Sequence, residues 1–182
     1  MITIRDQLSQ YTLVVTQQCS FKCTSCLLWK KKDVPSSSIK ESMKSGRYDS
    51  LLDKHKLINI IGGDPLCYDE LSFVLTYIRS KKCKIRLWTH SLFTLDQLAA
   101  INPLIDHWMV YLPTVVPEDY QLITGTGTWA EFDERLSFMV SEGYSLSVNM
   151  PVKVVTLDYL PELYEYVFDK KVPLVLHYLN GE

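Results

Sequence analysis

The sequence predicts an α/β fold whose parallel sheet is either open or curled into a partial barrel. Short β-branched or apolar runs alternate with longer segments of helical period, and this order repeats six times. Such alternation is typical of βα units joined by right-handed crossovers. With 182 residues and no long linker, we expect a single domain over residues 1–182. Ligands bind at the carboxyl ends of the strands in these folds, so the functional site is expected at that edge.

Six strands are expected from runs of apolar and β-branched residues. They cover residues 11–16, 57–61, 84–89, 107–112, 145–150 and 173–178. Helices are expected between them at residues 49–56, 69–80, 95–101, 128–141 and 157–169, where apolar residues recur every three or four positions. Gly143 is the expected stop of the fourth helix. Residues 30–45 hold several lysines, a proline and three consecutive serines, which predicts an exposed loop.

Charge and hydropathy exclude several classes of protein. The formal net charge is -2, so the chain as a whole has no field that would attract nucleic acid. Its longest apolar runs are broken well before the ~20 residues that a membrane span needs. The first residues lack the apolar core of a signal peptide. The expected compartment is therefore the cytoplasm, where clustered cysteines more often bind metal or do chemistry than form disulfides.

Three cysteines follow the first predicted strand closely. Cys19, Cys23 and Cys26 form a C-x-x-x-C-x-x-C motif. Three thiolates on one tight loop can bind three irons of a [4Fe–4S] cluster and leave the fourth iron open to a small molecule. A zinc site is the alternative, with Cys67, Cys83 or His90 as the fourth ligand, and three metal-free buried cysteines are the second alternative.

The motif and its position resemble the radical S-adenosylmethionine (SAM) superfamily. This resemblance implies a partial (β/α)6 barrel, a [4Fe–4S] cluster bound by Cys19, Cys23 and Cys26, and SAM bound at the open iron. It also implies reductive cleavage of SAM to a 5′-deoxyadenosyl radical that abstracts a hydrogen atom from a substrate. The pattern is most similar to the branch of peptide-modifying and molybdopterin-type enzymes. We expect no counterpart of that branch's cysteine-rich C-terminal domain.

Further matches to the superfamily follow along the later strands. Gly62, Gly63 and Asp64 stand where relatives have the Gly-Gly-Glu-Pro that holds the SAM amino group, and glycines let a backbone approach a ligand closely. The resemblance also implies SAM or pocket contacts at Thr89, His90, Tyr111 and Asn149. Thr124 stands where relatives often carry an arginine that neutralises the SAM carboxylate. The resemblance assigns no catalytic side chain.

The remaining cysteines and histidines are weighed by their position relative to the strand ends. Cys67 and His177 lie near the predicted site, whereas Cys83, His55 and His107 lie at the opposite edge and are expected to be structural. The resemblance implies a peptide, protein or small-molecule substrate and an electron donor such as flavodoxin or ferredoxin. Two other hypotheses stay open: a zinc- or cluster-binding interaction module that has lost SAM cleavage, and a subunit completed by a partner chain or a second copy.

Overall fold

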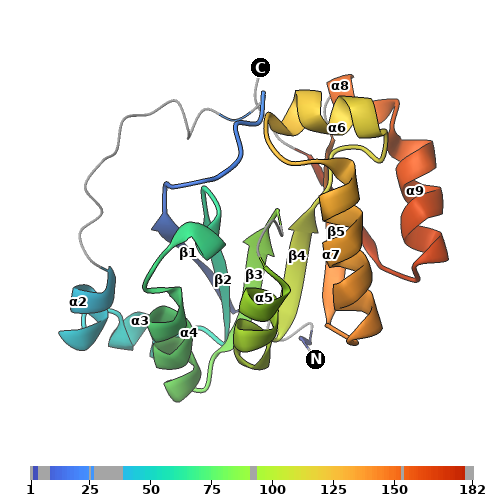
Figure 1. The fold of residues 1–182 in the computed structure, drawn as a ribbon. Coiled ribbons are helices and arrows are strands. Elements are labelled where there is room, and N and C mark those ends of the chain that lie inside the picture. The colour runs from blue at the N-terminus through green and yellow to red at the C-terminus, as the bar shows by residue number, and fades with distance from the viewer. Residues whose placement is uncertain are drawn as a thin grey trace.

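A single parallel sheet organises the molecule. The computed structural model describes residues 2–3, 9–24, 26, 39–90, 94–152 and 154–178. Its six strands are hydrogen-bonded in the order of the sequence, and all five pairings are parallel. They are β1 (Gln10–Thr16), β2 (Leu57–Gly62), β3 (Lys84–Thr89), β4 (His107–Tyr111), β5 (Leu146–Val152) and β6 (Leu174–Tyr178). The predicted fold class is confirmed, and the strands lie side by side in one sheet (Figure 1). Each strand lies within two residues of its predicted bounds.

Helices connect the strands and cover the outer face of the sheet. They are α2 (Ile39–Lys44), α3 (Asp49–Lys54), α4 (Leu71–Ser80), α5 (Leu95–Ile101), α6 (Pro117–Thr124), α7 (Trp129–Ser141), α8 (Val154–Leu157) and α9 (Leu160–Asp169). Short 3₁₀ turns, η2 (Pro65–Cys67) and η3 (Asn102–Leu104), follow β2 and α5. Two capping boxes start α5 and α7, because the Thr94 and Thr128 hydroxyls accept bonds from the first-turn amides of Gln97 and Glu131.

The expectation of a loop over residues 30–45 is wrong in its second half. Ile39 and Met43 are buried on one face of α2, and residues four apart lie on the same side of a helix. Residues 30–38 lie outside the described ranges. Helix α6 was not predicted from the sequence. It begins at Pro117 and ends before Gly125, which has a φ of +70° that glycine adopts easily.

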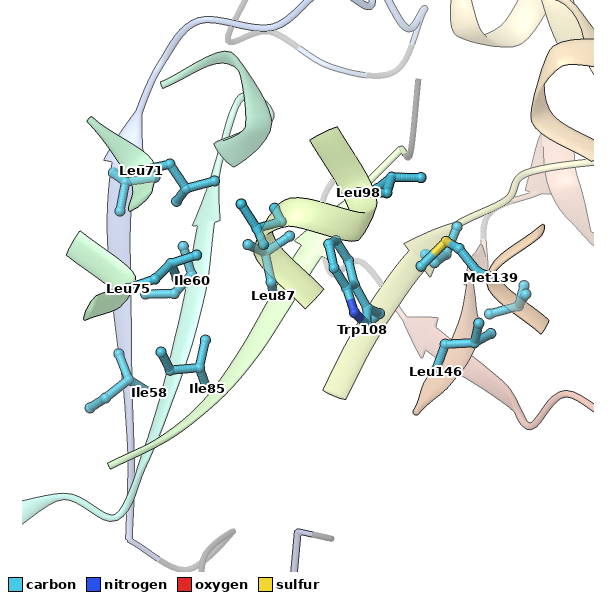
Figure 2. Close-up of a cluster of buried hydrophobic side chains, with 14 of the residues drawn as sticks. Ile58, Ile60, Leu71, Leu75, Ile85, Leu87, Leu98, Trp108, Met139 and Leu146 are labelled. Atoms are coloured by element: carbon cyan, nitrogen blue, oxygen red, sulfur yellow. The ribbon is translucent and has the colours of Figure 1, made fainter. Parts of the chain in front are cut away.

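The hydrophobic core lies between the sheet and its helices. Figure 2 shows Ile58, Ile60, Ile85 and Leu87 of β2 and β3 facing Leu71 and Leu75 of α4. Further along, Trp108 of β4 and Leu146 of β5 share the cluster with Met139 of α7. Burial of each such side chain stabilises the fold by roughly 1.5–3 kcal/mol. These residues occupy every second strand position, so the alternate positions must face the other side of the sheet.

The other side of the sheet lines a cavity. Asn59, Arg86, Met109 and Asn149 alternate with core residues on β2, β3, β4 and β5, and all four line a cavity. Polar and charged side chains thus occupy the concave face, where a close-packed protein would place apolar ones. Within the described part of the chain, no helix combines the length and apolar character needed to cross a bilayer.

Candidate functional site

The cysteine loop follows β1 and rests on the end of α6. The Lys22 amide donates to the Thr124 carbonyl at 3.0 Å, and the Thr24 amide donates to the Ile123 carbonyl at 2.9 Å. Gly125 permits this approach, because a Cβ at that position would lie 2.6 Å from the Lys22 carbonyl oxygen. Helix α6, which was not predicted from the sequence, therefore supports the cysteine loop, which was.

The three cysteines of the motif differ in exposure. Cys23 is buried, whereas Cys19 and Cys26 are partly exposed, and none of the chain's five cysteines, all of them in described ranges, forms a disulfide. Burial, together with the neighbouring charges of Asp64 and of other cysteines, raises the pKa of Cys19 and of Cys23 to about 12. Cys23 interacts electrostatically with both Cys19 and Cys26. Across the described ranges, no three metal-ligating side chains converge into a metal site. The fit to an iron–sulfur cluster rests on donor chemistry: three thiols on one loop, whose thiolates a metal would stabilise.

Gly62 and Gly63 join the end of β2 to the start of the cysteine loop. The Gly63 amide donates to the Thr16 carbonyl at 2.9 Å, and the Asp64 amide donates to the Gln18 carbonyl at 2.8 Å. A Cβ on Gly63 would lie 2.2 Å from the Gln18 carbonyl oxygen, and one on Gly62 would lie 2.5 Å from that of Thr16. Both glycines also line the cavity. Both positions thus require glycine because the backbone of the cysteine loop lies so close, whether or not a ligand also approaches them.

Asp64 lies behind the cavity wall. Its side chain is fully buried and it is not among the residues that line the cavity. The carboxylate accepts hydrogen bonds from the Thr89 hydroxyl at 2.9 Å, the His90 amide at 2.9 Å and the Leu66 amide at 3.0 Å. These bonds connect the ends of β2 and β3. In this arrangement Asp64 positions Thr89 and His90, which do line the cavity.

His90 connects the cysteine loop to the cavity. Its Nε2 lies 3.7 Å from the Cys23 Sγ. Its ring stacks on Phe21 at 4.4 Å between centroids and packs against Tyr111 at the same distance. These two aromatic contacts hold the imidazole in one orientation. Any group bound by the cysteines would therefore lie beside the cavity.

The cavity has a volume of about 550 Å³ and lies on the concave face of the sheet. The resemblance implied seven SAM or pocket contacts, and six of them line it: Gly62, Gly63, Thr89, His90, Tyr111 and Asn149. The other lining residues, which sequence reasoning passed over except for His177, are Gln10, Thr12, Asn59, Ile61, Arg86, Trp88, Met109, Pro151 and His177. The alternation of apolar and other residues across residues 84–89 was the signal that could have found Arg86 and Trp88.

Asn149 is the most buried polar group on the cavity wall after Thr89. It is 4% exposed, and its side-chain oxygen has no hydrogen-bond partner in the described part of the chain. A buried carbonyl oxygen without a donor costs about 1–3 kcal/mol, which a ligand with an N–H or O–H group would recover. The residue that the resemblance assigns to SAM is thus ready to accept a hydrogen bond.

The other residues singled out by sequence lie at or away from the cavity. Cys67 lies in η2 near Cys19 and Ser20 but outside the cavity lining, and burial raises the pKa of its thiol. Cys83 is buried at the far edge, where its thiol donates to the Leu52 carbonyl at 3.2 Å, as expected of a structural residue. The Thr124 hydroxyl is fully buried and donates to the Tyr120 carbonyl at 2.7 Å. Thr124 does not line the cavity, and its neutral hydroxyl does not replace the positive charge of the arginine that relatives often carry there.

The fold and the cysteine loop define the class of protein: an iron–sulfur domain on a six-stranded parallel α/β sheet. Residues 10–141 match the family described as "4Fe-4S single cluster domain". The chain belongs to this family, and the predicted membership of the radical SAM superfamily is confirmed. The match covers well over half of the chain and includes the whole cysteine motif.

Relatives and solved structures agree with this assignment. The probable GTP 3′,8-cyclase of Methanococcus maripaludis is 23% identical over 182 residues, which cover 96% of this chain and 59% of the cyclase. Streptococcus suis SuiB bound to S-adenosylmethionine has the same fold, with a TM-score of 0.80, 15% identity and coverage of 95% of this chain and 41% of SuiB. For anSMEcpe with bound AdoMet and a Cp18Cys peptide, the TM-score is 0.73, the identity 18% and the coverage 96% of this chain and 52% of that protein. The chain therefore spans about half the length of these proteins.

Proposed function

We propose that this chain is the core of a radical SAM enzyme. Cys19, Cys23 and Cys26 bind a [4Fe–4S] cluster, and SAM binds in the adjoining part of the cavity. The observation that carries the proposal is the 3.7 Å contact between Cys23 Sγ and His90 Nε2, because it brings a predicted cluster ligand against the cavity wall. A reduced cluster held by these three cysteines would supply one electron for the cleavage of SAM to methionine and a 5′-deoxyadenosyl group, which would become 5′-deoxyadenosine by taking a hydrogen atom from the substrate.

The protein's own residues bind and orient the cofactor. The Asn149 oxygen accepts a hydrogen bond from SAM, and Gly62 and Gly63 present backbone to it without a Cβ in the way. Asp64 acts indirectly by holding the Thr89 hydroxyl and the His90 amide in place. Phe21, His90 and Tyr111 form an aromatic wall that keeps water from the region beside Cys23.

Substrate and partners follow from the same assignment. The relatives named above include a GTP cyclase and an enzyme with a bound peptide, so a small molecule or a peptide is the proposed substrate class. Flavodoxin or ferredoxin is the proposed electron donor. Five cysteines without a disulfide suit the reducing cytoplasm.

Anaerobic reconstitution with iron and sulfide tests the proposal. We expect about four irons per chain and, under strong reductant, release of 5′-deoxyadenosine from SAM. Cys23→Ala is the matched negative variant and should release none. Zinc in the purified chain together with no deoxyadenosine after reconstitution would contradict the proposal.

That outcome would instead favour an interaction module with a zinc site. One observation supports this second candidate: His90 Nε2 lies 3.7 Å from Cys23 Sγ, so these two atoms could bind the same zinc ion as part of a Cys₃His ligand set. Such a module would bind one zinc per chain and would lose it in both Cys23→Ala and His90→Ala. A cluster bound by three cysteines would survive His90→Ala.

A further inference from the structure

A second part of the concave face lies deeper than the cysteine loop. Arg86 and Trp88 precede His90 by four and two positions on β3, so they lie roughly 13 Å and 7 Å further toward the amino end of the strand. Both line the 550 Å³ cavity and also an adjoining cavity of about 520 Å³. Met109 and His107 of β4 contribute to the wall of the second cavity. The concave face is therefore hollow well beyond the region assigned to SAM.

Arg86 is an uncompensated cation in this space. Neither cavity is lined by an Asp or a Glu among the described residues, and none of these residues pairs with the guanidinium. Its Nε is shielded from solvent and has no hydrogen-bond partner among the described residues. Burial lowers the pKa of Arg86. By contrast, Arg79 at the surface pairs with Asp106 at 2.6 Å.

Arg86 is partly buried, and its shielded Nε has lost hydration that no described group replaces. An apolar side chain could fill the same space without that loss, so the retention of a cation here calls for an explanation. The Trp88 indole Nε1 beside it is also buried without a partner in the described chain. Among the described residues, two donors on one face of β3 thus lack acceptors, and a ligand that supplies acceptors would satisfy them.

The chemistry of the two side chains restricts that ligand. Guanidinium and indole N–H groups only donate, so the ligand must present an acceptor. Arg86 is the one Lys or Arg among the described residues that line either cavity, which matches a single anionic group rather than a polyphosphate. A planar carboxylate accepts two parallel bonds from guanidinium. The Trp88 ring and Met109 provide apolar surface for the rest of the molecule.

We propose that Arg86 and Trp88 form the substrate subsite, which binds the carboxylate group of a small molecule. This inference rests on the proposed function, since it places the substrate in the same cavity as SAM. It names a substrate class that the radical SAM assignment leaves open. It also separates this chain from enzymes that act on nucleoside triphosphates, whose several charges would need several cations.

Binding of a simple aromatic carboxylate tests the subsite. The reconstituted protein with saturating SAM is titrated by calorimetry with benzoate, with uncharged benzamide and with phenyl phosphate. We expect benzoate to bind at least tenfold more tightly than benzamide, because the Arg86 contact is charge-assisted. We expect Arg86→Gln to weaken benzoate binding by roughly tenfold to a hundredfold. Arg86→Lys should keep part of the affinity, and the exposed Arg47→Gln should keep all of it.

Several outcomes would overturn the proposal. These are equal binding of benzoate and benzamide to the wild type, equal benzoate binding to wild type and Arg86→Gln, and tighter binding of phenyl phosphate than of benzoate. If Arg86→Gln fails to fold, the benzoate and benzamide comparison on the wild type still decides. A loss of SAM affinity as large as the loss of benzoate affinity would reassign Arg86 to the cofactor. Absence of 5′-deoxyadenosine from the wild type contradicts the proposed function alone, since calorimetry reports the subsite without SAM cleavage.

Discussion

The Thr89 hydroxyl lies 2.9 Å from each carboxylate oxygen of Asp64, and this contact joins the carboxyl end of β3 to that of β2. Asp64 is fully buried and Thr89 is 3% exposed, so water cannot replace either partner. The same carboxylate accepts a hydrogen bond from the backbone amide of His90. The ring of His90 in turn lies 3.7 Å from the Cys23 Sγ. A single buried acid thus determines how two strand ends and the cysteine loop fit together.

Asp64→Asn should destabilise the protein. The amide replaces one acceptor oxygen with a donor, which would face the hydroxyl and amide donors that now bind the carboxylate. One buried unsatisfied contact of this kind costs about 1–3 kcal/mol. Urea unfolding of the wild type and the variant measures the change. The exposed Asp158→Asn is the matched control and should lie within about 0.5 kcal/mol of the wild type.

Gly63→Ala should prevent the end of β2 from packing against the cysteine loop. The added Cβ would lie 2.2 Å from the Gln18 carbonyl oxygen, and backbone on both sides must shift to relieve that contact. We expect a loss of more than about 2 kcal/mol of stability and weaker iron loading. Gly143→Ala tests the specificity of this effect, because a Cβ there meets nothing within 4 Å and only the φ of +69° is unfavourable. A Gly63→Ala variant as stable as Gly143→Ala would show that the close approach is not needed.

Cys23→Ala should abolish cluster loading, whereas Cys83→Ala should load normally. Cys23 is the buried member of the motif, while Cys83 lies at the far edge of the sheet, with its thiol bonded to the carbonyls of Leu52 and His55. Iron and sulfide analysis with absorption spectroscopy after reconstitution measures the loading. Cys83→Ala is expected to lose about 1 kcal/mol of stability through its missing hydrogen bonds. If both variants load equally, the ligand assignment is wrong.

The stability of the protein should fall as the pH drops below the ordinary histidine range. Burial and the nearby charge of Arg86 lower the pKa of His107, whose ring nitrogens contact the Ser145 and Ser147 hydroxyls at 2.9 Å and 3.0 Å. A histidine with a lowered folded pKa is protonated first in the unfolded chain. Protons therefore favour unfolding once the pH falls below about 6.5, and the contribution vanishes above it.

Urea unfolding of the wild type and of His107→Gln, between about pH 7.5 and about pH 5.5, measures this dependence. The variant should show a smaller decrease in the free energy of unfolding over that range than the wild type. Arg86→Gln should also show a smaller decrease, since it removes one of the causes of the shift. Identical pH slopes in wild type and His107→Gln would mean that another group causes the fall.

Much of the fold was evident in the sequence because its signals are local. The strand over Lys84–Thr89 and the helix over Leu95–Ile101 match their predicted bounds, since alternation and capping residues are properties of neighbouring positions. The iron–sulfur motif was evident for the same reason, since its three cysteines lie within eight residues of one another. Helix α2 was not predicted because it has only two buried apolar residues, Ile39 and Met43, and the lysines and serines before it are typical of a loop.

What the sequence by itself determined is thus the α/β class, the positions of the six strands and the cysteine motif that follows the first of them. Tertiary structure alone decided which residues meet across the sheet: that α6 supports the loop, that Asp64 holds Thr89 and His90, and that Arg86 lies in a cavity without an acid partner among the described residues. The physical reason is that these relationships join positions tens of residues apart. Local patterns specify which face of a strand a side chain occupies, but only the packed sheet specifies what it meets there.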